Sequence, residues 1–165
     1  MATRYKCFLL FLVLVFTSCS TTHYYVVRHG ERLNNSDDSP LSDAGFRRAE
    51  ALRDVLAERR IGVIYVSDKI RTQQMATPTA ELFDIEPIII AKAETDRLIA
   101  ELKDVTGRSV LVVRHSEEIH SIVNALSPSD TIEPIGNEFD NLFVIRRQIY
   151  FGQTEITLQR LRYGE

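Results

Sequence analysis

The chain has 165 residues, which fits one globular domain and leaves little room for two. Apolar residues make up 44% of the chain and charged residues 26%, so the protein is neither disordered nor fibrous and can bury a core. The 20 lysine and arginine residues and 23 acidic residues give a net charge of −3, which argues against the general basic field of a nucleic-acid-binding protein.

The start of the chain differs in composition from all that follows. A short basic stretch precedes an apolar run over residues 7–16, which is too short to span a bilayer but has the length of the apolar core of a secretory signal peptide. The small residues before Cys19 resemble the lipobox of bacterial lipoproteins, although Phe16 stands where that motif usually has leucine. We therefore expect a lipoprotein signal peptide over residues 1–18, a lipidated tether over 19–22 and one domain over 23–165. An uncleaved anchor or a soluble secreted protein is the alternative.

Lipidation of Cys19 has two consequences. Cys7 leaves with the signal peptide, so no thiol remains for a disulfide, a metal or a nucleophile. The protein is expected in the cell envelope, anchored by lipid to a bacterial membrane. Ser20 after the cysteine favours the outer membrane in a double-membraned bacterium.

Downstream, apolar runs alternate with segments of helical period, a pattern typical of repeated β-α units. Strands are predicted at residues 23–27, 61–66, 86–90 and 109–113. Their Val- and Ile-rich runs without alternation are typical of strands covered on both faces, at the centre of a parallel sheet.

Four helices are predicted between and after these strands. The first carries an apolar stripe of Phe46, Ala49, Leu52, Val55 and Leu56, with Ser42 as its cap. The second covers residues 70–83, with a kink or restart at the internal proline at position 78. The third starts at about residue 95, and the fourth carries an apolar face over residues 119–126.

The tail of the chain changes character. Two strands joined around Gly152 are predicted at residues 142–145 and 154–161. Such a hairpin suits an antiparallel edge on a mostly parallel sheet. The predicted fold is thus an α/β three-layer sandwich, with helices on both faces of the sheet and an antiparallel C-terminal edge.

Two of the predicted strands end in nearly the same residues, VVRHG at 26–30 and VVRHS at 112–116. Ligands bind outside the carboxyl ends of the strands in open parallel sheets, so His29 and His115 are expected to converge there. Arg28 and Arg71 are expected at the same crevice. Guanidinium groups bind phosphate oxygens in bidentate fashion, so this set favours a phosphate site without a metal or other cofactor.

Four segments carry a resemblance to a known family. Residues 24–31 (YYVVRHGE), 41–52 (LSDAGFRRAEAL), 64–80 (IYVSDKIRTQQMATPTA) and 110–119 (VLVVRHSEEI) are similar to the histidine phosphatase superfamily. Its short form includes the small bacterial phosphohistidine phosphatases and its long form the cofactor-dependent phosphoglycerate mutases. The resemblance implies a phosphatase that acts on a phosphomonoester or a phosphoramidate, in a phosphorylated small molecule or a phosphoprotein.

The resemblance also implies roles for individual residues. His29 is expected to be the nucleophile that forms a phosphohistidine, and Arg28 and Arg71 to hold the phosphoryl oxygens. His115 is expected to donate a hydrogen bond to the same group, and Gly30 to let the backbone pass close to the phosphate.

The proton donor for the leaving group is less defined by the sequence. Glu117 follows the second histidine, whereas its rival Glu94 lies where many family members carry an acid, and some small members manage without one. Arg114 and Glu117 depart from the family pattern, and we expect them either to pair with each other at the pocket or to tune substrate choice.

Two other functions are weighed against the phosphatase. A lipoprotein that binds a phosphorylated ligand in a retained but inactive pocket is the alternative. A mutase ranks third, because the short connections leave little room for the insertions that reorient a bisphosphorylated intermediate. A zinc-protease reading fails because His115 and His120 are five residues apart and the helical motif needs four.

Overall fold

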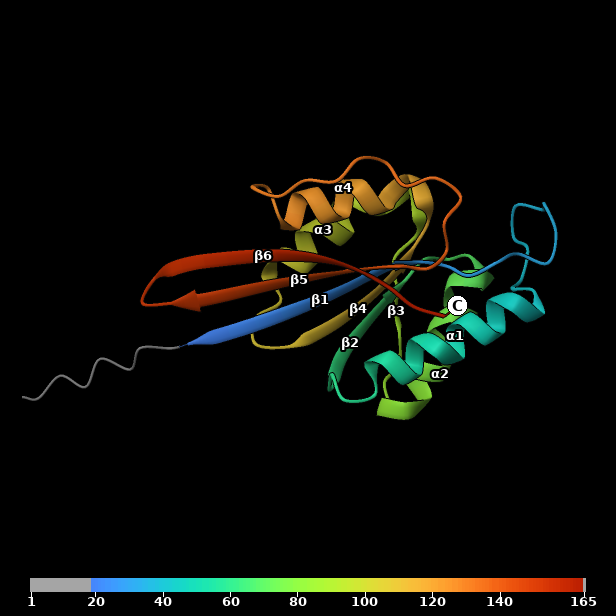
Figure 1. The fold of residues 1–165 in the computed structure, drawn as a ribbon, viewed down its shortest axis with the longest axis horizontal. Coiled ribbons are helices and arrows are strands. Elements are labelled where there is room, and N and C mark those ends of the chain that lie inside the picture. Colours follow the sequence, from blue (N-terminus) through green and yellow to red (C-terminus); the bar gives the residue numbers. More distant parts are fainter. Residues whose placement is uncertain (1–18, 165) are drawn as a thin grey trace, which may run out of the picture.

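The computed structural model describes residues 19–164, which form an α/β fold in three layers (Figure 1). The expected signal peptide over residues 1–18 lies outside the described residues. The elements are, in chain order, β1 (Ser20–Arg28), α1 (Asp43–Leu56), β2 (Ile61–Val66), α2 (Ile70–Phe83), β3 (Ile88–Ile89), the 3-10 helix η1 (Lys92–Glu94), α3 (Thr95–Asp104), β4 (Ser109–Arg114), α4 (Ser116–Leu126), β5 (Asn141–Tyr150) and β6 (Gln153–Arg162).

One sheet of six strands, in the order β3-β2-β4-β1-β5-β6, forms the middle layer. β3, β2, β4 and β1 run parallel, and β5 and β6 add the antiparallel edge. The predicted fold class is therefore confirmed. β1 begins earlier than predicted, so residues 20–22 pair with β5 and do not form a free tether.

One predicted central strand is in fact a short edge. Of residues 86–90 only Ile88 and Ile89 are strand, both are exposed, and they pair with β2 alone. Pro87 precedes them and has no N–H to donate to a ladder, which limits the strand at its start. An apolar strand with one neighbouring strand has the same kind of sequence as an apolar strand with two. The apolar pattern therefore led to the wrong prediction of a central strand.

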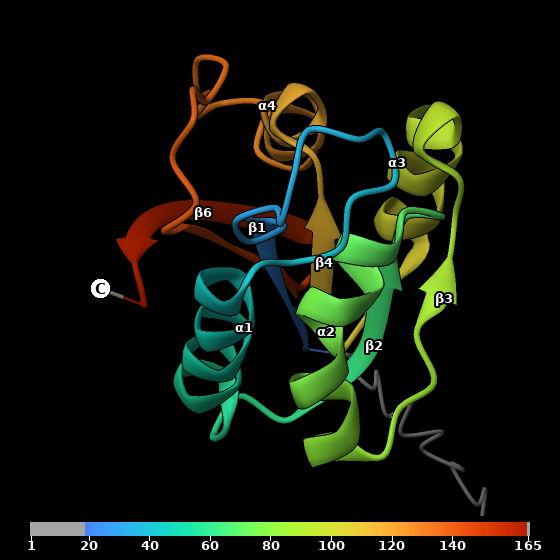
Figure 2. The same cartoon turned by 90° about the vertical axis from the view of Figure 1, so that its right-hand side faces the viewer.

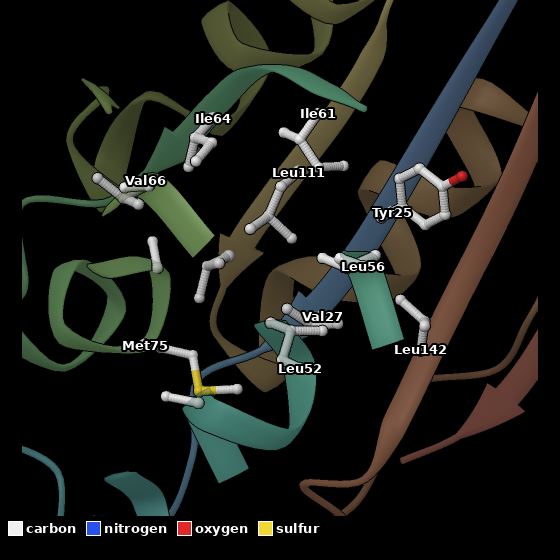
Figure 3. Packing of buried hydrophobic residues seen from close by; sticks show 14 of the residues in the cluster. Tyr25, Val27, Leu52, Leu56, Ile61, Ile64, Val66, Met75, Leu111 and Leu142 are labelled. Carbon is white, nitrogen blue, oxygen red and sulfur yellow. The ribbon is translucent and has the colours of Figure 1, made fainter. Parts of the chain in front are cut away.

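The alternation of side chains along β1 divides the core into two halves. Tyr25 and Val27 pack against α1 and α2, in the cluster that contains Leu52 and Met75 (Figure 3). Tyr24 and Val26 point to the other face, which α3 and α4 cover (Figure 2). Burial on both faces fixes the register of β1 and hence the position of its carboxyl end.

The helices are largely as predicted, with two differences. The Ser42 side chain caps α1 by accepting from the Gly45 N–H at 3.3 Å, but Phe46 and Val55 are exposed and do not belong to the buried stripe. α2 continues through Pro78 as one helix, so the predicted restart is absent; buried residues before and after the proline hold the helix on the sheet. No helix within residues 19–164 is both long and apolar enough to span a membrane.

The tail forms the predicted hairpin, with ten residues in each strand and a two-residue loop at Phe151 and Gly152. This hairpin and the start of β1 lie at one end of the molecule, and the loop over residues 29–42 lies at the other (Figure 1). The second long loop, residues 127–140, leads from α4 back to β5.

Candidate active site

The candidate site lies beyond the carboxyl ends of β1 and β4, where the two RH motifs meet. Arg28 and Arg114 are register partners in these parallel strands, so the next residues, His29 and His115, lie side by side. Their ring centroids are 5.2 Å apart and the rings meet edge to face. Both histidines are buried, and the convergence predicted from the strand ends is therefore present.

A cavity of about 230 Å³ opens at this point. Its lining is polar throughout, with Arg28, His29, Arg32, Asp37, Arg71, Lys92, His115, Ser116 and Glu117. Four of these side chains are cationic and two are anionic, although the whole chain is acidic. α4 begins at Ser116, so the positive end of its dipole also faces the cavity. These features favour an anion.

His29 has the hydrogen-bonding pattern of a nucleophile. Its Nδ1 lies 2.7 Å from the Gly30 carbonyl oxygen, which can only accept, so the proton is on Nδ1 and the Nε2 lone pair is free. Burial is the main cause that lowers the pKa of His29 to about 4, and the positive charges of Arg71 and Arg28 lower it further. The hydrogen bond to the Gly30 carbonyl acts in the opposite direction but is outweighed. The imidazole is therefore neutral at physiological pH.

The two predicted phosphate-binding arginines reach the cavity from different elements. The Arg28 guanidinium lies 4.2 Å from the centroid of the Phe139 ring and donates to the Gly136 carbonyl at 3.0 Å. Arg71, near the start of α2, donates to the Asp37 carbonyl at 2.7 Å. The Nε atom of each arginine is buried without a protein partner, so each retains a donor. Burial lowers the pKa of both guanidinium groups, which an anionic ligand would reverse.

His115 is held by protein partners on both ring nitrogens. Arg71 Nη2 lies 3.2 Å from Nδ1, and since arginine only donates, Nδ1 accepts and the proton is on Nε2. Nε2 then donates to Ser67 Oγ at 2.9 Å. Burial, followed by the charge of Arg71, lowers the pKa of His115 to about 2, so this ring is neutral. The expected bond from His115 to a phosphoryl group thus requires one of these partners to give way.

The two carboxylates proposed as the acid lie in different places. Glu117 lines the cavity and forms an ion pair with Lys92, whereas Glu94 is in η1, outside the cavity, with Arg97 as its partner at 3.3 Å. Partial burial would raise the pKa of Glu117, but the hydrogen bond from Lys92 and the local backbone bond outweigh it and bring the pKa to about 2. Glu117 is therefore an ionised carboxylate in this arrangement.

Arg114 is not at the pocket, contrary to expectation. Its side chain is fully buried and pairs with Glu118 at 2.6 Å rather than with Glu117. It also donates to the carbonyls of Ile90 and of residues 66, 91 and 92. The Arg114 side chain points to the face of the sheet that α4 covers, and the Glu118 side chain on α4 points toward Arg114. Successive residues of a helix are turned by about 100°, so the neighbouring Glu117 side chain points toward the crevice instead.

Gly30 is also outside the cavity lining. A Cβ atom there would lie 2.9 Å from the Cα of Gly45, so the glycine is needed for the close approach of α1.

Sequence reasoning missed Arg32, Asp37 and Lys92 as lining residues. Lys92 follows β3, so the rule that ligands bind beyond strand ends would have found it had the short edge strand been placed correctly. Arg32 and Asp37 lie in the loop over residues 29–42, whose path no periodicity predicts. Within residues 19–164, the His, Cys, Asp and Glu side chains do not gather into a set that could hold a metal ion.

Comparisons with known proteins agree with this geometry. Residues 24–96 match the model of the histidine phosphatase superfamily (branch 1), and sequence comparison with curated proteins finds no match. The matched segment contains Arg28, His29 and Arg71, and it ends before His115.

The fold is similar to that of several solved structures. A mycobacterial hydrolase has 17% identity and a TM-score of 0.67, over 83% of this chain and 96% of its own. A mycobacterial glucosyl-3-phosphoglycerate phosphatase has 18% identity and a TM-score of 0.66, over 86% and 99%. The protein histidine phosphatase SixA, complexed with tungstate, has 18% identity and a TM-score of 0.60, over 85% and 96%.

The family model thus covers the first half of the described domain, and the solved structures, which are 17–18% identical to this chain, share its fold.

Proposed function

We propose that this protein hydrolyses a phosphomonoester or a phosphoramidate through a phosphohistidine on His29. The observation that carries the proposal is the buried, neutral His29 imidazole, whose Nδ1 proton is held by the Gly30 carbonyl while Nε2 is left free in a cationic cavity. Among the fold neighbours, the protein histidine phosphatase SixA was solved with tungstate and a mycobacterial glucosyl-3-phosphoglycerate phosphatase with inorganic phosphate, and the cationic cavity of this chain suits oxyanions of that kind.

The reaction follows from these positions in two steps. His29 Nε2 attacks phosphorus, a P–N bond to the histidine forms, and the P–O or P–N bond to the leaving group breaks. Arg28 and Arg71 stabilise the negative charge spread over the phosphoryl oxygens. Water then attacks the phosphohistidine, which releases inorganic phosphate and frees the imidazole. The leaving group takes its proton from water or from a cavity group whose proton affinity rises when the substrate dianion binds.

The polar lining restricts what enters with the phosphoryl group. All nine lining residues are polar, so the cavity offers no apolar wall to an attached ring or chain. We infer that the phosphoryl group alone is enclosed and that the remainder of the substrate, whether a small molecule or a phosphoprotein, stays outside near the loops over residues 29–42 and 127–140.

Trapping of the phosphoenzyme tests the proposal. The protein is mixed with a labelled phosphodonor, quenched, and analysed for an acid-labile, base-stable adduct on His29. His29→Asn is expected to abolish the adduct and to lower kcat by a factor on the order of 10³ or more. His120→Asn, on the side of α4 outside the cavity, is the matched control and is expected to retain the adduct.

A second function has one observation in its favour. Glu117 is ionised beside Lys92, so among the described residues no protonated carboxyl group lines the cavity. A pocket of this kind binds phosphate but protonates a leaving group poorly. Vanadate binding without any trapped adduct, tried with several phosphodonors, would replace the phosphatase with a phosphate-ligand-binding protein.

We also propose that the protein is a lipoprotein anchored through Cys19 in the bacterial cell envelope. Cys19 is exposed, immediately precedes β1 and follows the apolar run of the signal-like segment. The mass of the membrane-extracted protein tests this: acylation adds the lipid mass to a chain that begins at Cys19, and Cys19→Ser is expected to remove it. An unmodified chain that retains residues 1–18 would contradict the proposal.

A further inference from the structure

The β5–β6 hairpin ends in two exposed aromatic side chains. Tyr150 and Phe151 are 54% and 61% exposed, and their ring centroids are 4.3 Å apart in an edge-to-face pair. Phe151 has a φ of 48° in a two-residue loop, a position at which asparagine or glycine is usual. A large apolar side chain is thus held in a conformation that costs energy, at the tip of a protruding hairpin and away from both core clusters.

Basic side chains lie beside the first residues of β1, the strand that pairs with this hairpin. Two cavities meet there: one is lined by His23, Arg59 and Arg146, the other by His23, Arg59, Arg60 and Arg108. Within residues 19–164, none of these four arginines has a carboxylate within 4.0 Å, whereas Arg48, Arg53, Arg97, Arg114, Arg160 and Arg162 all do.

The positive charge of this surface is opposite in sign to the net charge of the chain. Two carboxylates, Glu58 and Glu155, line the two cavities beside the start of β1 and the hollow beside the hairpin tip, against four arginines. The chain as a whole has a net charge of −3. A cationic surface on an acidic protein is a local feature, and it is complementary to an anionic partner.

Cys19 and the start of β1 lie next to the tip of the hairpin. Ser20 pairs with Ile149, next to the hairpin tip, and the Gln148 side-chain amide approaches Cys19 Sγ at 3.8 Å. The hairpin tip and the start of β1 lie together at the end of the molecule opposite the candidate site (Figure 1). Arg59, Arg60 and Arg108 line a cavity together with Thr21 and His23, and Arg146 is the register partner of His23, so the four arginines lie beside the first residues of β1. A surface that contacts Cys19 and the start of β1 is therefore near both the aromatic tip and the four arginines.

We propose that this end of the protein is a membrane-docking surface: Tyr150 and Phe151 enter the interface of an anionic bilayer, and Arg59, Arg60, Arg108 and Arg146 contact its phosphate headgroups. Tyrosine and phenylalanine at a membrane interface add apolar contact, and each nearby arginine adds attraction to anionic lipid. The proposal rests on the lipid anchor proposed above, but not on phosphatase activity. It assigns an orientation in which the candidate site points away from the membrane.

The chain contains no tryptophan, so a single introduced tryptophan reports its own surroundings. The full chain is expressed in a bacterium, purified from its membranes and reconstituted into vesicles of phosphatidylcholine and phosphatidylglycerol that contain brominated lipid. Phe151→Trp is expected to show emission shifted to shorter wavelength and about twofold more quenching than Leu33→Trp. Leu33 is the matched control because it is 63% exposed in the loop at the opposite end.

The contribution of the arginines is tested in the Phe151→Trp background. Arg59→Gln combined with Arg60→Gln is expected to reduce the quenching to the level seen in vesicles of phosphatidylcholine alone. Arg47→Gln, which removes charge from an exposed site on α1, is expected to leave the quenching unchanged. Quenching that is unchanged by the combined Arg59→Gln and Arg60→Gln substitutions would show that these arginines do not contact the membrane.

Three results would overturn the proposal. Equal quenching of the probes at positions 151 and 33 would mean that the protein has no preferred orientation. Emission that shifts with protein concentration in detergent would assign the aromatic tip to a second copy of the chain. Recovery of the protein only from the soluble fraction would show that it has no lipid anchor. A phosphatase assay on the same preparations reports the proposed activity independently of each result.

Discussion

At the scale of single residues, the site depends on imidazoles that stay neutral beside cations. Burial lowers the pKa of His29 to about 4 and that of His115 to about 2, while Arg71 lies next to both. A protonated imidazole in this cavity would repel the arginines that we propose as phosphate ligands, and it would lose the lone pair that the proposed attack needs. The low pKa of His29 and the cationic cavity therefore both suit the proposed chemistry.

The titration of His29 follows from this. Because the folded-state pKa lies below the ordinary value of 6.5, His29 is expected to remain neutral on acidification until about pH 4. NMR of protein labelled at histidine, assigned with His29→Asn, measures the midpoint directly. Over the window between pH 4 and 6.5 the unfolded chain binds a proton that folded His29 does not, so the unfolding free energy falls as pH is lowered. A midpoint near 6.5 would show that His29 is exposed to solvent.

Arg114 and Glu118 form a buried pair that holds the cavity edge. Arg114 Nη2 donates to the carbonyls of Ala91 and Lys92, so the pair fixes the segment that presents Lys92. Arg114→Met is expected to lower the unfolding free energy by roughly 3–5 kcal/mol, because it leaves the Glu118 carboxylate buried without a cation.

A double substitution separates the effect of the unpaired buried charge from the effect of lost side-chain packing. Arg114→Met combined with Glu118→Leu removes both charges, so it is expected to recover most of the stability lost in the single variant. Urea denaturation of the three proteins provides the comparison. A single variant as stable as the parent protein would show that the pair contributes little.

At the scale of elements, α1 is set against the turn after β1 by two glycines. A Cβ atom on Gly45 would lie 2.4 Å from the Glu31 carbonyl oxygen, which is backbone and has little freedom to move. The same contact positions Gly30, whose carbonyl holds the Nδ1 proton of His29. The packing of one helix end thus orients the imidazole.

The sign of the stability change caused by Gly45→Ala tests this contact. In an exposed helix interior the change from glycine to alanine stabilises by about 1 kcal/mol, whereas here it is expected to destabilise by about 1–3 kcal/mol and to lower kcat. Gly136→Ala is the control, because nothing lies within 4 Å of its added Cβ. Thermal unfolding and turnover are measured on both. A stabilised Gly45→Ala protein would contradict the close contact.

Elements with a strong apolar period were the ones that the sequence predicted. β2 and α2 begin and end where the pattern placed them, and the two histidines meet because strand ends converge in a parallel sheet. β3 was misplaced because an edge and a centre have the same composition. The partners of Arg114 and Glu117 were misjudged because pairing depends on the direction in which each side chain leaves its helix or strand, and loop residues such as Arg32 follow no period.

At the scale of the whole molecule, the two ends carry different chemistry. One end holds the candidate site and its long loops, and the other holds Cys19, the aromatic tip of the hairpin and the unpaired arginines. β1 connects them, because Ser20 begins the strand and His29 directly follows it. At about 3.3 Å per residue, the ten residue-to-residue steps from Cys19 to His29 span roughly 33 Å.

This separation makes a prediction about activity at a membrane. If Cys19 is the anchor, the cavity stands roughly 33 Å from the bilayer surface, so hydrolysis of a small soluble phosphoester is expected to be the same within about twofold in detergent and in vesicles. A phosphorylated lipid headgroup in the same bilayer is expected to be a poor substrate, since the cavity cannot reach it. Initial rates with both substrates on one reconstituted sample measure this. Faster turnover of the lipid than of the soluble ester would mean that the site faces the membrane, and that the docking end has been assigned to the wrong side of the molecule.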